Sequence, residues 1–303
     1  MIQLIFLGTG GTIPTDRRSL PATVIQCERE ILLFDCGEGA QHRYLQSGLR
    51  LNRPMKIFIT HLHGDHILGL PGLLQTFSLL GRDNPLTIFG PPGISAFIKA
   101  MIRTVKFHLS FPLSLKEIHN GTVVRTEDYK IESAPANHSV PCLSYAFVES
   151  DKPGKFHPDK AIALGLKPGP MFGDLQRGLK VRVGRKVVKP SQVMDQPQRG
   201  IKIVLSGDTY YSKNLVALAA KADILVHECT FDDSLHEKAM SDLHSTPEIA
   251  AKVAKQAKVQ KLILNHITQR YPEPEKLLEQ ALSRFPRTIV AEDLQRITVN
   301  RSR

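Results

Sequence analysis

The sequence predicts an α/β fold in which helices cover the faces of β-sheets. Short runs rich in Val, Ile, Leu and Phe alternate with segments of helical periodicity, an alternation typical of this class. Several of the predicted strands end at a glycine, a histidine or an aspartate. The chain has 303 residues, 42% of them hydrophobic and 23% charged, so it can bury a large core.

The N-terminal half contains four predicted strands that read as continuous apolar runs: MIQLIFLG, ILLFDCG, KIFITH and LTIFG. The fourth is followed by PPGISAFIKAMIRT, a predicted helix that Pro-Gly opens. KIESAPANHS and CLSYAFVES are two further predicted strands, separated by turn-forming residues. Strands and helices thus already mix in the first half of the chain.

From Ile201 the alternation becomes regular. IKIVLSGDT, DILVHECTF, KLILNHI and TIVAEDLQRITV are predicted strand segments, and NLVALAAKA, TPEIAAKVAKQA and PEKLLEQALSRF are the predicted helices between them. The second helix has two possible starts: Ser245 with Glu248 as a capping box, or Thr246 with Pro247 at the first position. Either start places His244 just before a positive helix end, which predicts a lowered pKa for His244.

Residues 151 to about 200 interrupt this alternation and are predicted to form an inserted arm without a core of its own. The segment is dense in Gly, Pro and cations, without helical or strand periodicity. Between Asp151 and Lys202 there are twelve Lys or Arg and four Asp, a surplus of eight within a net charge of +11. Such a surplus predicts a patch for a polyanion such as nucleic acid, and the alternative is a solvated loop.

The rest of the composition predicts a cytoplasmic protein without a membrane partner. No signal peptide is expected at MIQLIFLGTGG, and no apolar stretch is long enough to cross a bilayer. The four cysteines are scattered without C-x-x-C spacing, as expected of reduced thiols.

The segment FITHLHGDHILGL, residues 58 to 70, carries the main chemical signal. His61, His63, Asp65 and His66 follow a predicted strand within six positions. Alternate residues His61 and His63 can face one way while Asp65 and His66 face another, which suits two adjacent metals better than one. Imidazole and carboxylate ligands favour Zn²⁺, with Mn²⁺ or Fe²⁺ as substitutes.

A two-metal site needs about seven protein ligands if each ion keeps a position for water or substrate. Three further candidates lie at the ends of predicted strands: His138 in SAPANHSVP, Asp208 in IVLSGDTYY and His266 in LILNHITQRY. Each alone is a weak signal, because a single His or Asp at a strand end is often structural. Together with the first cluster they complete the predicted set.

These residues resemble the metallo-β-lactamase superfamily and, within it, the ribonuclease Z family of transfer-RNA 3′-processing endonucleases in its short form. The resemblance covers essentially the whole chain and is carried by FLGTGGTIPT, LFDCGEGAQHR, HGDHILGLPGLL, FGPPG, SGDT, VHECTF, LHST and LNHI. GLKPGP inside the arm also supports it. It implies a single domain over residues 1–303, a four-layer αβ/βα sandwich with a flexible arm at about 151–200.

The resemblance also implies roles for individual residues. His61, His63 and His138 would hold one zinc ion, Asp65, His66 and His266 the second, and Asp208 would bridge the two. Asp65 would act as general base, His244 would protonate the leaving 3′ oxygen, and Glu228 would orient His244. Such an enzyme removes the 3′ trailer from precursor tRNA, leaving a 3′-hydroxyl on the tRNA and a 5′-phosphate on the trailer.

The resemblance further implies a homodimer in which the arm of one subunit grips the tRNA that the other cleaves. The predicted RNA contacts are Arg18, Gly169, Pro170, Arg177, Lys180, Arg182, Arg185 and Lys186. The segment PTDRRSLPA departs from the family pattern, because it has Arg17 and Arg18 but lacks the family's asparagine.

Two other functions remain open from the sequence. A metallohydrolase of small phosphodiesters or thioesters would use the same metals but would leave the basic arm without a purpose. An RNA-binding module with structural zinc is disfavoured, because structural zinc sites are usually rich in thiolates and no cysteine is expected near the cluster.

Overall fold

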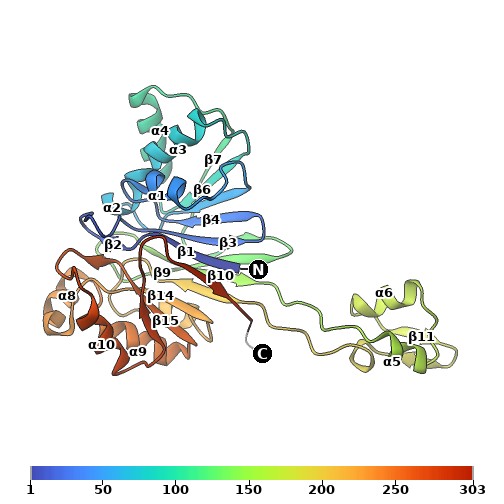
Figure 1. The fold of residues 1–303 in the computed structure, drawn as a ribbon. Helices are drawn as coiled ribbons and strands as arrows, with labels where there is room; N and C mark the ends of the chain where they lie inside the picture. The colour runs from blue at the N-terminus through green and yellow to red at the C-terminus, as the bar shows by residue number, and fades with distance from the viewer. Residues whose placement is uncertain (1, 302–303) are drawn as a thin grey trace. The chain divides into compact units, whose positions relative to one another are not determined.

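The computed structural model describes residues 2–301. Contacts within the chain divide it into two compact units, labelled by element in Figure 1: a main body, which runs to Val148 and resumes at Ile201, and the arm, Glu149–Gly200. None of the helices in the described part of the chain has the length and apolar character needed to cross a membrane. All four cysteines lie in the described part of the chain, where they are buried and form no disulfide.

The first sheet of the main body has seven strands in the order β18-β1-β3-β4-β5-β6-β7. β4 to β7 run parallel, and helices cross over between them, as parallel pairing requires. The strands are β1 Ile2–Gly8, β3 Ala22–Cys27, β4 Glu30–Phe34, β5 Met55–Phe58, β6 Leu86–Gly90, β7 Leu113–Glu117 and β18 Arg296–Val299. The helices are α1 Ala40–Gln46, α2 Gly64–Ile67, α3 Gly69–Leu79 and α4 Ile94–Val105.

The second sheet also has seven strands, in the order β17-β15-β14-β13-β10-β9-β8. β13, β14, β15 and β17 run parallel. The strands are β8 Gly121–Arg125, β9 Tyr129–Pro135, β10 Leu143–Glu149, β13 Lys202–Leu205, β14 Ile224–Glu228, β15 Lys261–Asn265 and β17 Thr288–Val290. The helices are α7 Lys213–Leu218, α8 His236–Asp242 (after a 3-10 turn at Asp233–Leu235), α9 Pro247–Ala257 and α10 Glu275–Leu282.

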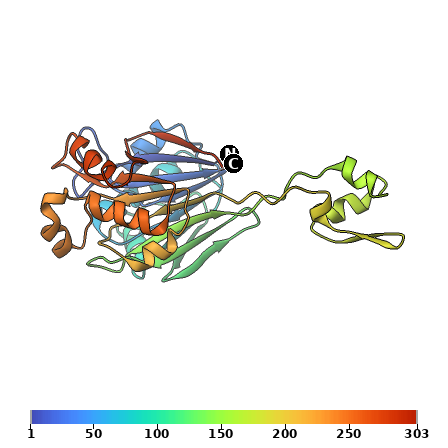
Figure 2. The same cartoon turned by 90° about the horizontal axis from the view of Figure 1, so that it is seen from below.

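The alternation of side chains along the strands separates three apolar cores. Leu32 and Phe34 of β4 lie in the core between the two sheets, whereas Ile31 and Leu33 lie in the core between the first sheet and its helices. A third core packs α7, α9 and α10 against the outer face of the second sheet. Figures 1 and 2 show this order of helices, sheet, sheet and helices, so the predicted four-layer αβ/βα sandwich is confirmed.

The arm has a small core of its own, contrary to the expectation from the sequence. It contains α5 Pro158–Ala163, α6 Pro170–Gln176, a hairpin of β11 Val181–Val183 and β12 Lys186–Val188, and a 3-10 turn at Pro190–Gln192. The buried side chains are Ala161, Leu166, Leu175, Val181, Val188 and Val193. Because these elements span only three to seven residues between Gly and Pro, none is long enough to show a period in the sequence.

Candidate metal centre

The predicted ligands lie where strands of both sheets end. His61 follows β5 of the first sheet, while His138, Asp208 and His266 follow β9, β13 and β15 of the second. Ligand sites at the carboxyl ends of strands are the usual arrangement in α/β folds. The two sheets therefore each contribute part of one cluster.

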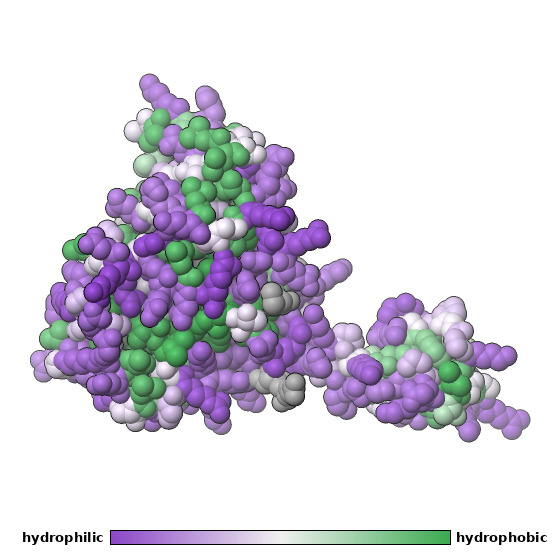
Figure 3. Space-filling model, viewed as in Figure 1, coloured by the Kyte–Doolittle hydropathy of each residue, from purple (hydrophilic) through white to green (hydrophobic). Residues whose placement is uncertain are grey.

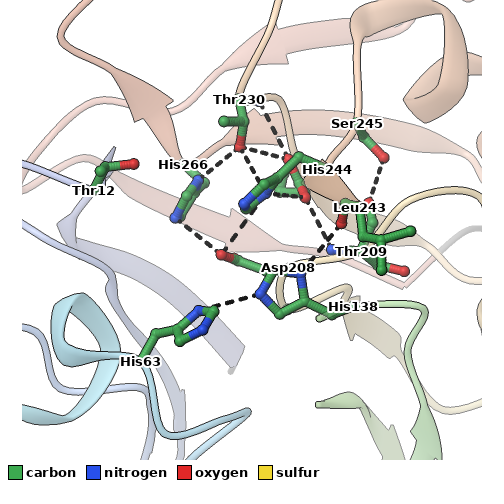
Figure 4. A network of polar contacts seen from close by, with 12 residues as sticks. Thr12, His63, His138, Asp208, Thr209, Thr230, Leu243, His244, Ser245 and His266 are labelled. Atoms are coloured by element: carbon green, nitrogen blue, oxygen red, sulfur yellow. Dashed lines mark hydrogen bonds and ion pairs between the residues drawn. The ribbon is translucent and has the colours of Figure 1, made fainter. Parts of the chain in front are cut away.

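Three imidazole nitrogens form the first group. His63 Nδ1 lies 3.1 Å from His61 Nε2 and 3.2 Å from His138 Nε2. Figure 4 shows the rings of His63 and His138 directed toward each other beside Asp208. The three residues offer ligand atoms within 4.8 Å of one another, a spacing that a single metal ion can bridge.

The second group combines carboxylates with imidazoles. Asp65 Oδ2 lies 3.7 Å from His66 Nε2 and 3.4 Å from His266 Nε2. Asp208 reaches both groups: its Oδ1 is 3.4 Å from His66 Nε2, and its Oδ2 is 3.3 Å from His266 Nε2 and 3.8 Å from His61 Nε2. Asp208 therefore has the position that a bridging ligand requires.

The electrostatics of the cluster suit a cation. Burial raises the pKa of Asp208, but the charges of His266 and His66 outweigh it and hold the pKa of that carboxyl well below its usual range. Burial lowers the pKa of His66, but Asp208 and Asp35 raise it well above the ordinary value. The ionised carboxylates thus favour protonation of His66, and a divalent cation binds such a site by displacing that proton.

Among the ligand nitrogens of the cluster, two that are buried lack a hydrogen-bond partner in the described part of the chain. They are His66 Nε2 and His266 Nε2, the atoms that face the carboxylates. Since buried polar atoms are normally satisfied, these nitrogens fit a bound metal.

In three of the histidine rings, the nitrogen that points away from the cluster contacts a residue outside it. His66 Nδ1 lies 2.8 Å from Asp35 Oδ2 and therefore donates to it. His61 Nδ1 is 2.9 Å from Thr60 Oγ1, and His138 Nδ1 is 3.2 Å from the Leu243 carbonyl. An Nδ1–H that donates outward leaves the Nε2 lone pair directed inward, as a metal ligand needs. None of these outer residues was predicted to support the site.

Thr230 links the His266 ring to Glu228. Thr230 Oγ1 lies 2.7 Å from Glu228 Oε2. It also lies 2.9 Å from His266 Nδ1, and Figure 4 shows this contact between Thr230 and the His266 ring. Because the carboxylate can only accept, the hydroxyl donates to Glu228 and accepts from His266. The same carboxylate therefore supports a predicted ligand as well as the predicted acid His244.

His244 is paired with Glu228 through its Nδ1, 2.9 Å from Oε1. Burial lowers the pKa of His244, but the charge of Glu228 and this hydrogen bond raise it to about 9. The lowered pKa expected from the helix start was therefore wrong, because the nearby carboxylate outweighs the helix end. The helix α9 begins with Thr246 as N-cap and Pro247 in the first turn, the second of the two predicted starts.

A cysteine does lie near the cluster, which corrects the expectation that none would. Cys142 Sγ is 3.7 Å from His61 Nδ1, the nitrogen that faces away from the other ligands. Burial raises the pKa of the Cys142 thiol well above its ordinary value. Because the thiol stays protonated and lies on the outer side of His61, Cys142 packs against the ring without acting as a ligand. The predicted metal ligands are therefore all nitrogen and oxygen atoms.

The backbone is adapted to the close packing of the ligands. A Cβ on Gly11 would lie 2.4 Å from His266 Nδ1, so only glycine leaves room for that ring. Gly11 belongs to the short strand β2 Gly10–Gly11, which pairs with β16 Ile267–Thr268 beside His266. His266 itself has φ 58°, a strained value for a residue with a side chain, as often found at functional sites.

A cavity of about 500 Å³ opens onto the centre. Its walls include His63, Asp65, Asp208, His244 and His266, together with Thr12, Ile13, Pro14, Leu20, Glu38, Gly64 and Leu68. Asp65 Oδ2 also accepts a hydrogen bond from Thr12 N at 2.8 Å, which ties the N-terminal loop to the site. Asp65, the predicted base, and His244, the predicted acid, therefore line the same cavity.

The predicted RNA contacts divide between the main body and the arm. Arg18 Nη1 donates to Thr9 Oγ1 and to the Ala291 carbonyl, each at 2.7 Å, so part of its guanidinium supports the fold. In the arm, Gly169 and Pro170 begin α6, and the exposed cations lie beside α6 or on the hairpin: Arg177, Lys180, Arg182, Arg185 and Lys186. Figure 3 shows mostly hydrophilic side chains around a hydrophobic patch on the arm's visible face.

Comparison with known proteins gives two kinds of match by sequence. A family model described as anti-Pycsar protein Apyc1 matches residues 2–153. Ribonuclease Z from Methanothermobacter thermautotrophicus is 44% identical over 299 residues, covering 99% of this chain and 97% of the relative. Ribonuclease BN from Enterobacter sp. is 40% identical over 98% of this chain and 100% of the relative. The chain belongs to the ribonuclease Z family.

Solved structures agree with this membership. The short form of human tRNase Z is 28% identical with a TM-score of 0.73, covering 98% of this chain and 99% of the other. The metallo-β-lactamase fold protein YhfI from Bacillus subtilis, at 16% identity, has a TM-score of 0.70 over 98% and 100% of the two chains. The fold of the main body is therefore the metallo-β-lactamase fold found in the ribonuclease Z family.

Proposed function

We propose that the centre holds two zinc ions and cleaves precursor tRNA immediately before its 3′ trailer. As a member of the ribonuclease Z family, the chain is a metal-dependent hydrolytic endoribonuclease of tRNA 3′ processing. The observation that carries the two-metal proposal is the pair of ligand groups that share Asp208. His61, His63 and His138 would hold one ion, and Asp65, His66 and His266 the other.

The nitrogen and oxygen donors fit Zn²⁺, and Mn²⁺ or Fe²⁺ are substitutes that the same donors accept. When bound, two such cations supply Lewis acidity, which activates water for attack and neutralises charge on the phosphate. The residues of the chain position the reacting groups and transfer the protons.

Asp65 and His244 carry the proton transfers in this proposal. Asp65 accepts a proton from the attacking water, since its carboxylate stays ionised and faces the cavity. His244 donates a proton to the leaving 3′ oxygen, since Glu228 holds its Nδ1 and favours its protonated form. General acid catalysis of this kind contributes about 10² to 10⁴-fold to the rate.

The test is cleavage of a 3′-extended precursor tRNA, with the cut mapped, by the zinc-loaded protein and two variants. Asp65→Ala and His244→Ala should each lose at least about a hundredfold in rate. The exposed Asp83→Ala serves as control and should cleave like the wild type. Full activity in either site variant would remove the role assigned to that residue.

The arm is proposed to grip the tRNA away from the cut, through its surplus of cations. Deletion of residues 151–200 should weaken tRNA binding and flatten its dependence on salt, while hydrolysis of bis-p-nitrophenyl phosphate persists. Loss of both activities together would make the arm structural instead.

Two further features belong to the same proposal. The enzyme is proposed to be a homodimer, in which the arm of one subunit serves the centre of the other. A cytoplasmic location stays a prediction, made from the pattern of cysteines.

A further inference from the structure

A second cavity adjoins the metal centre at His138. Its volume is about 400 Å³, and its lining includes several prolines together with Ile118, His119, Asn120, His138 and Val140. A volume of this size falls within the range of about 300–1,000 Å³ typical of small-ligand sites. No other lining residue of this cavity is among the predicted ligands, so the mechanism above leaves it without a role.

We infer that this cavity receives the base of the first trailer nucleotide, on the side of the scissile phosphate opposite the tRNA. The inference rests on the proposed function, because it assumes that the substrate is a 3′-extended RNA.

The chemistry of the lining fits a nucleobase. Apart from the two histidines, no residue with an ionisable carboxylate, ammonium or guanidinium group lines the cavity, which disfavours a phosphate as occupant. Proline rings and the side chains of Ile118 and Val140 offer apolar surface against which a base can pack. His119 and Asn120 add polar groups that can hydrogen-bond a base edge, the combination used for unstacked nucleotides.

The position of His244 favours the first trailer nucleotide as the occupant of this cavity. His244 lines the cavity of about 500 Å³, together with Asp65, and is absent from the lining of the second cavity. In the proposed reaction His244 protonates the leaving 3′ oxygen, which belongs to the tRNA side. The nucleotide that keeps the phosphate is then assigned to the side of His138, whose Nε2 lies 3.2 Å from His63 Nδ1 and whose ring centroid lies 4.9 Å from that of His244.

The surface also offers a continuation for the strand. A further hollow of about 430 Å³ shares Asn120 and Pro135 with the second cavity and extends over β8, β9 and α7. Asn214 and Lys202 are among its lining residues. A trailer that enters beside His138 can therefore follow the edge of the second sheet.

The experiment compares two precursor tRNAs that differ only in the first trailer nucleotide, one with a base and one abasic. Wild-type zinc enzyme should cleave the substrate with the base with a kcat/KM about tenfold higher, as expected when a base is packed against protein. Val140→Trp fills the cavity and should reduce this ratio to near one. Val105→Trp, at an exposed position outside the cavity, should keep the wild-type ratio.

Asn120→Ala provides a second variant at an exposed position, in case Val140→Trp fails to fold. Loss of one hydrogen bond to the base should lower the ratio about threefold. Equal cleavage of both RNAs by the wild type, or ratios unchanged in both cavity variants, would overturn this inference alone. Hydrolysis of bis-p-nitrophenyl phosphate without cleavage of either RNA would overturn the proposed function and the inference with it.

Discussion

Asp35 shows how a residue that faces no substrate can define the centre. Its Oδ1 accepts hydrogen bonds from Thr60 N at 2.7 Å and Thr60 Oγ1 at 3.0 Å, while Oδ2 accepts from His66 Nδ1. Its backbone has φ 58°, a strained value that the surrounding contacts maintain. One carboxylate thus fixes the orientation of two neighbouring ligands, His66 directly and His61 through Thr60.

Replacement of Asp35 by Asn should weaken metal binding by about 10 to 100-fold, the usual effect of losing a partner behind a metal ligand. The amide keeps the size of the carboxylate but has a single acceptor oxygen for the donors of Thr60 and His66. Zinc affinity can be measured by competition with a chelator. The exposed Asp83→Asn is the control, and equal affinity in both variants would show that Asp35 does not orient the ligands.

His227 gives a pH dependence that belongs to the fold. Burial lowers the pKa of His227 below its ordinary 6.5, more than its contact with Glu228 raises it. Below pH 6.5, the imidazole therefore takes up a proton in the unfolded chain but not in the folded chain. The contribution of His227 to the free energy of unfolding is complete above pH 6.5 and decreases as the pH falls below this value. The slope for one such group is about 1.4 kcal/mol per pH unit.

The variant His227→Gln should accordingly lose less stability than the wild type between pH 6.5 and lower pH. Urea unfolding across this range, at fixed zinc concentration, gives the free energy of unfolding at each pH. His42→Gln, at an exposed position, should follow the wild-type curve. If the stability of His227→Gln falls with pH as steeply as that of the wild type, protonation of His227 does not cause the loss of stability at low pH.

At the level of elements, the sequence predicted several buried strands but missed others, among them the buried β3 and the exposed β7 and β8. Ile57 and Phe58 of β5 are fully buried on both faces and stand out as an apolar run, as do the residues of β1 and β14. β7 Leu113–Glu117 and β8 Gly121–Arg125 are the outer strands of their sheets and largely exposed, so their residues are mixed and carry a weak signal. Whether such a segment forms an edge strand depends on its packing against neighbouring strands, which a single sequence does not show.

The residues that hydrogen-bond to the metal ligands could not be predicted from the sequence for a similar reason. Asp35 follows β4, and its contact with Thr60 depends on the pairing that places Phe34 opposite Phe58. The motif of His61, His63, Asp65 and His66 is local and visible in the sequence, whereas a partner from a neighbouring strand becomes visible only with the sheet register.

The arm provides a prediction about folding of a separate element. Leu175 is fully buried in the arm's own core, so Leu175→Ala should remove about 2–5 kcal/mol of stability from a unit with few buried side chains. The arm should then unfold, and tRNA affinity should fall while bis-p-nitrophenyl phosphate hydrolysis is retained. Leu179→Ala is the matched control, because Leu179 is 54% exposed in the same unit.

Hydrogen exchange of the arm's amides separates folding from binding. Fast exchange throughout the arm in Leu175→Ala with unchanged exchange in the main body would agree with an independent core. Unchanged protection in the arm would mean that its core does not hold it together.

At the scale of the whole molecule, the centre requires the main body to be assembled. His61, His63, Asp65 and His66 come from the first sheet, whereas His138, Asp208 and His266 come from the second. The sequence alone placed all seven at predicted strand ends, but the convergence of those ends depends on the packing of one sheet on the other. Metal binding is therefore coupled to the contact between the sheets, since each of the two proposed ligand groups, His61/His63/His138 and Asp65/His66/His266, draws on both.

The proposed homodimer predicts that two inactive variants restore activity when they form a mixed dimer. A chain with Asp65→Ala keeps its arm but lacks the base, and a chain without residues 151–200 keeps the base but lacks the arm. Each alone should cleave precursor tRNA poorly. If the arm of one subunit serves the centre of its partner, equal amounts mixed and re-associated should recover about a quarter of wild-type activity, because half the dimers are mixed and each has one complete site. A mixture in which both chains carry Asp65→Ala is the control, and no recovery in the first mixture would place the arm and the centre it serves on the same chain.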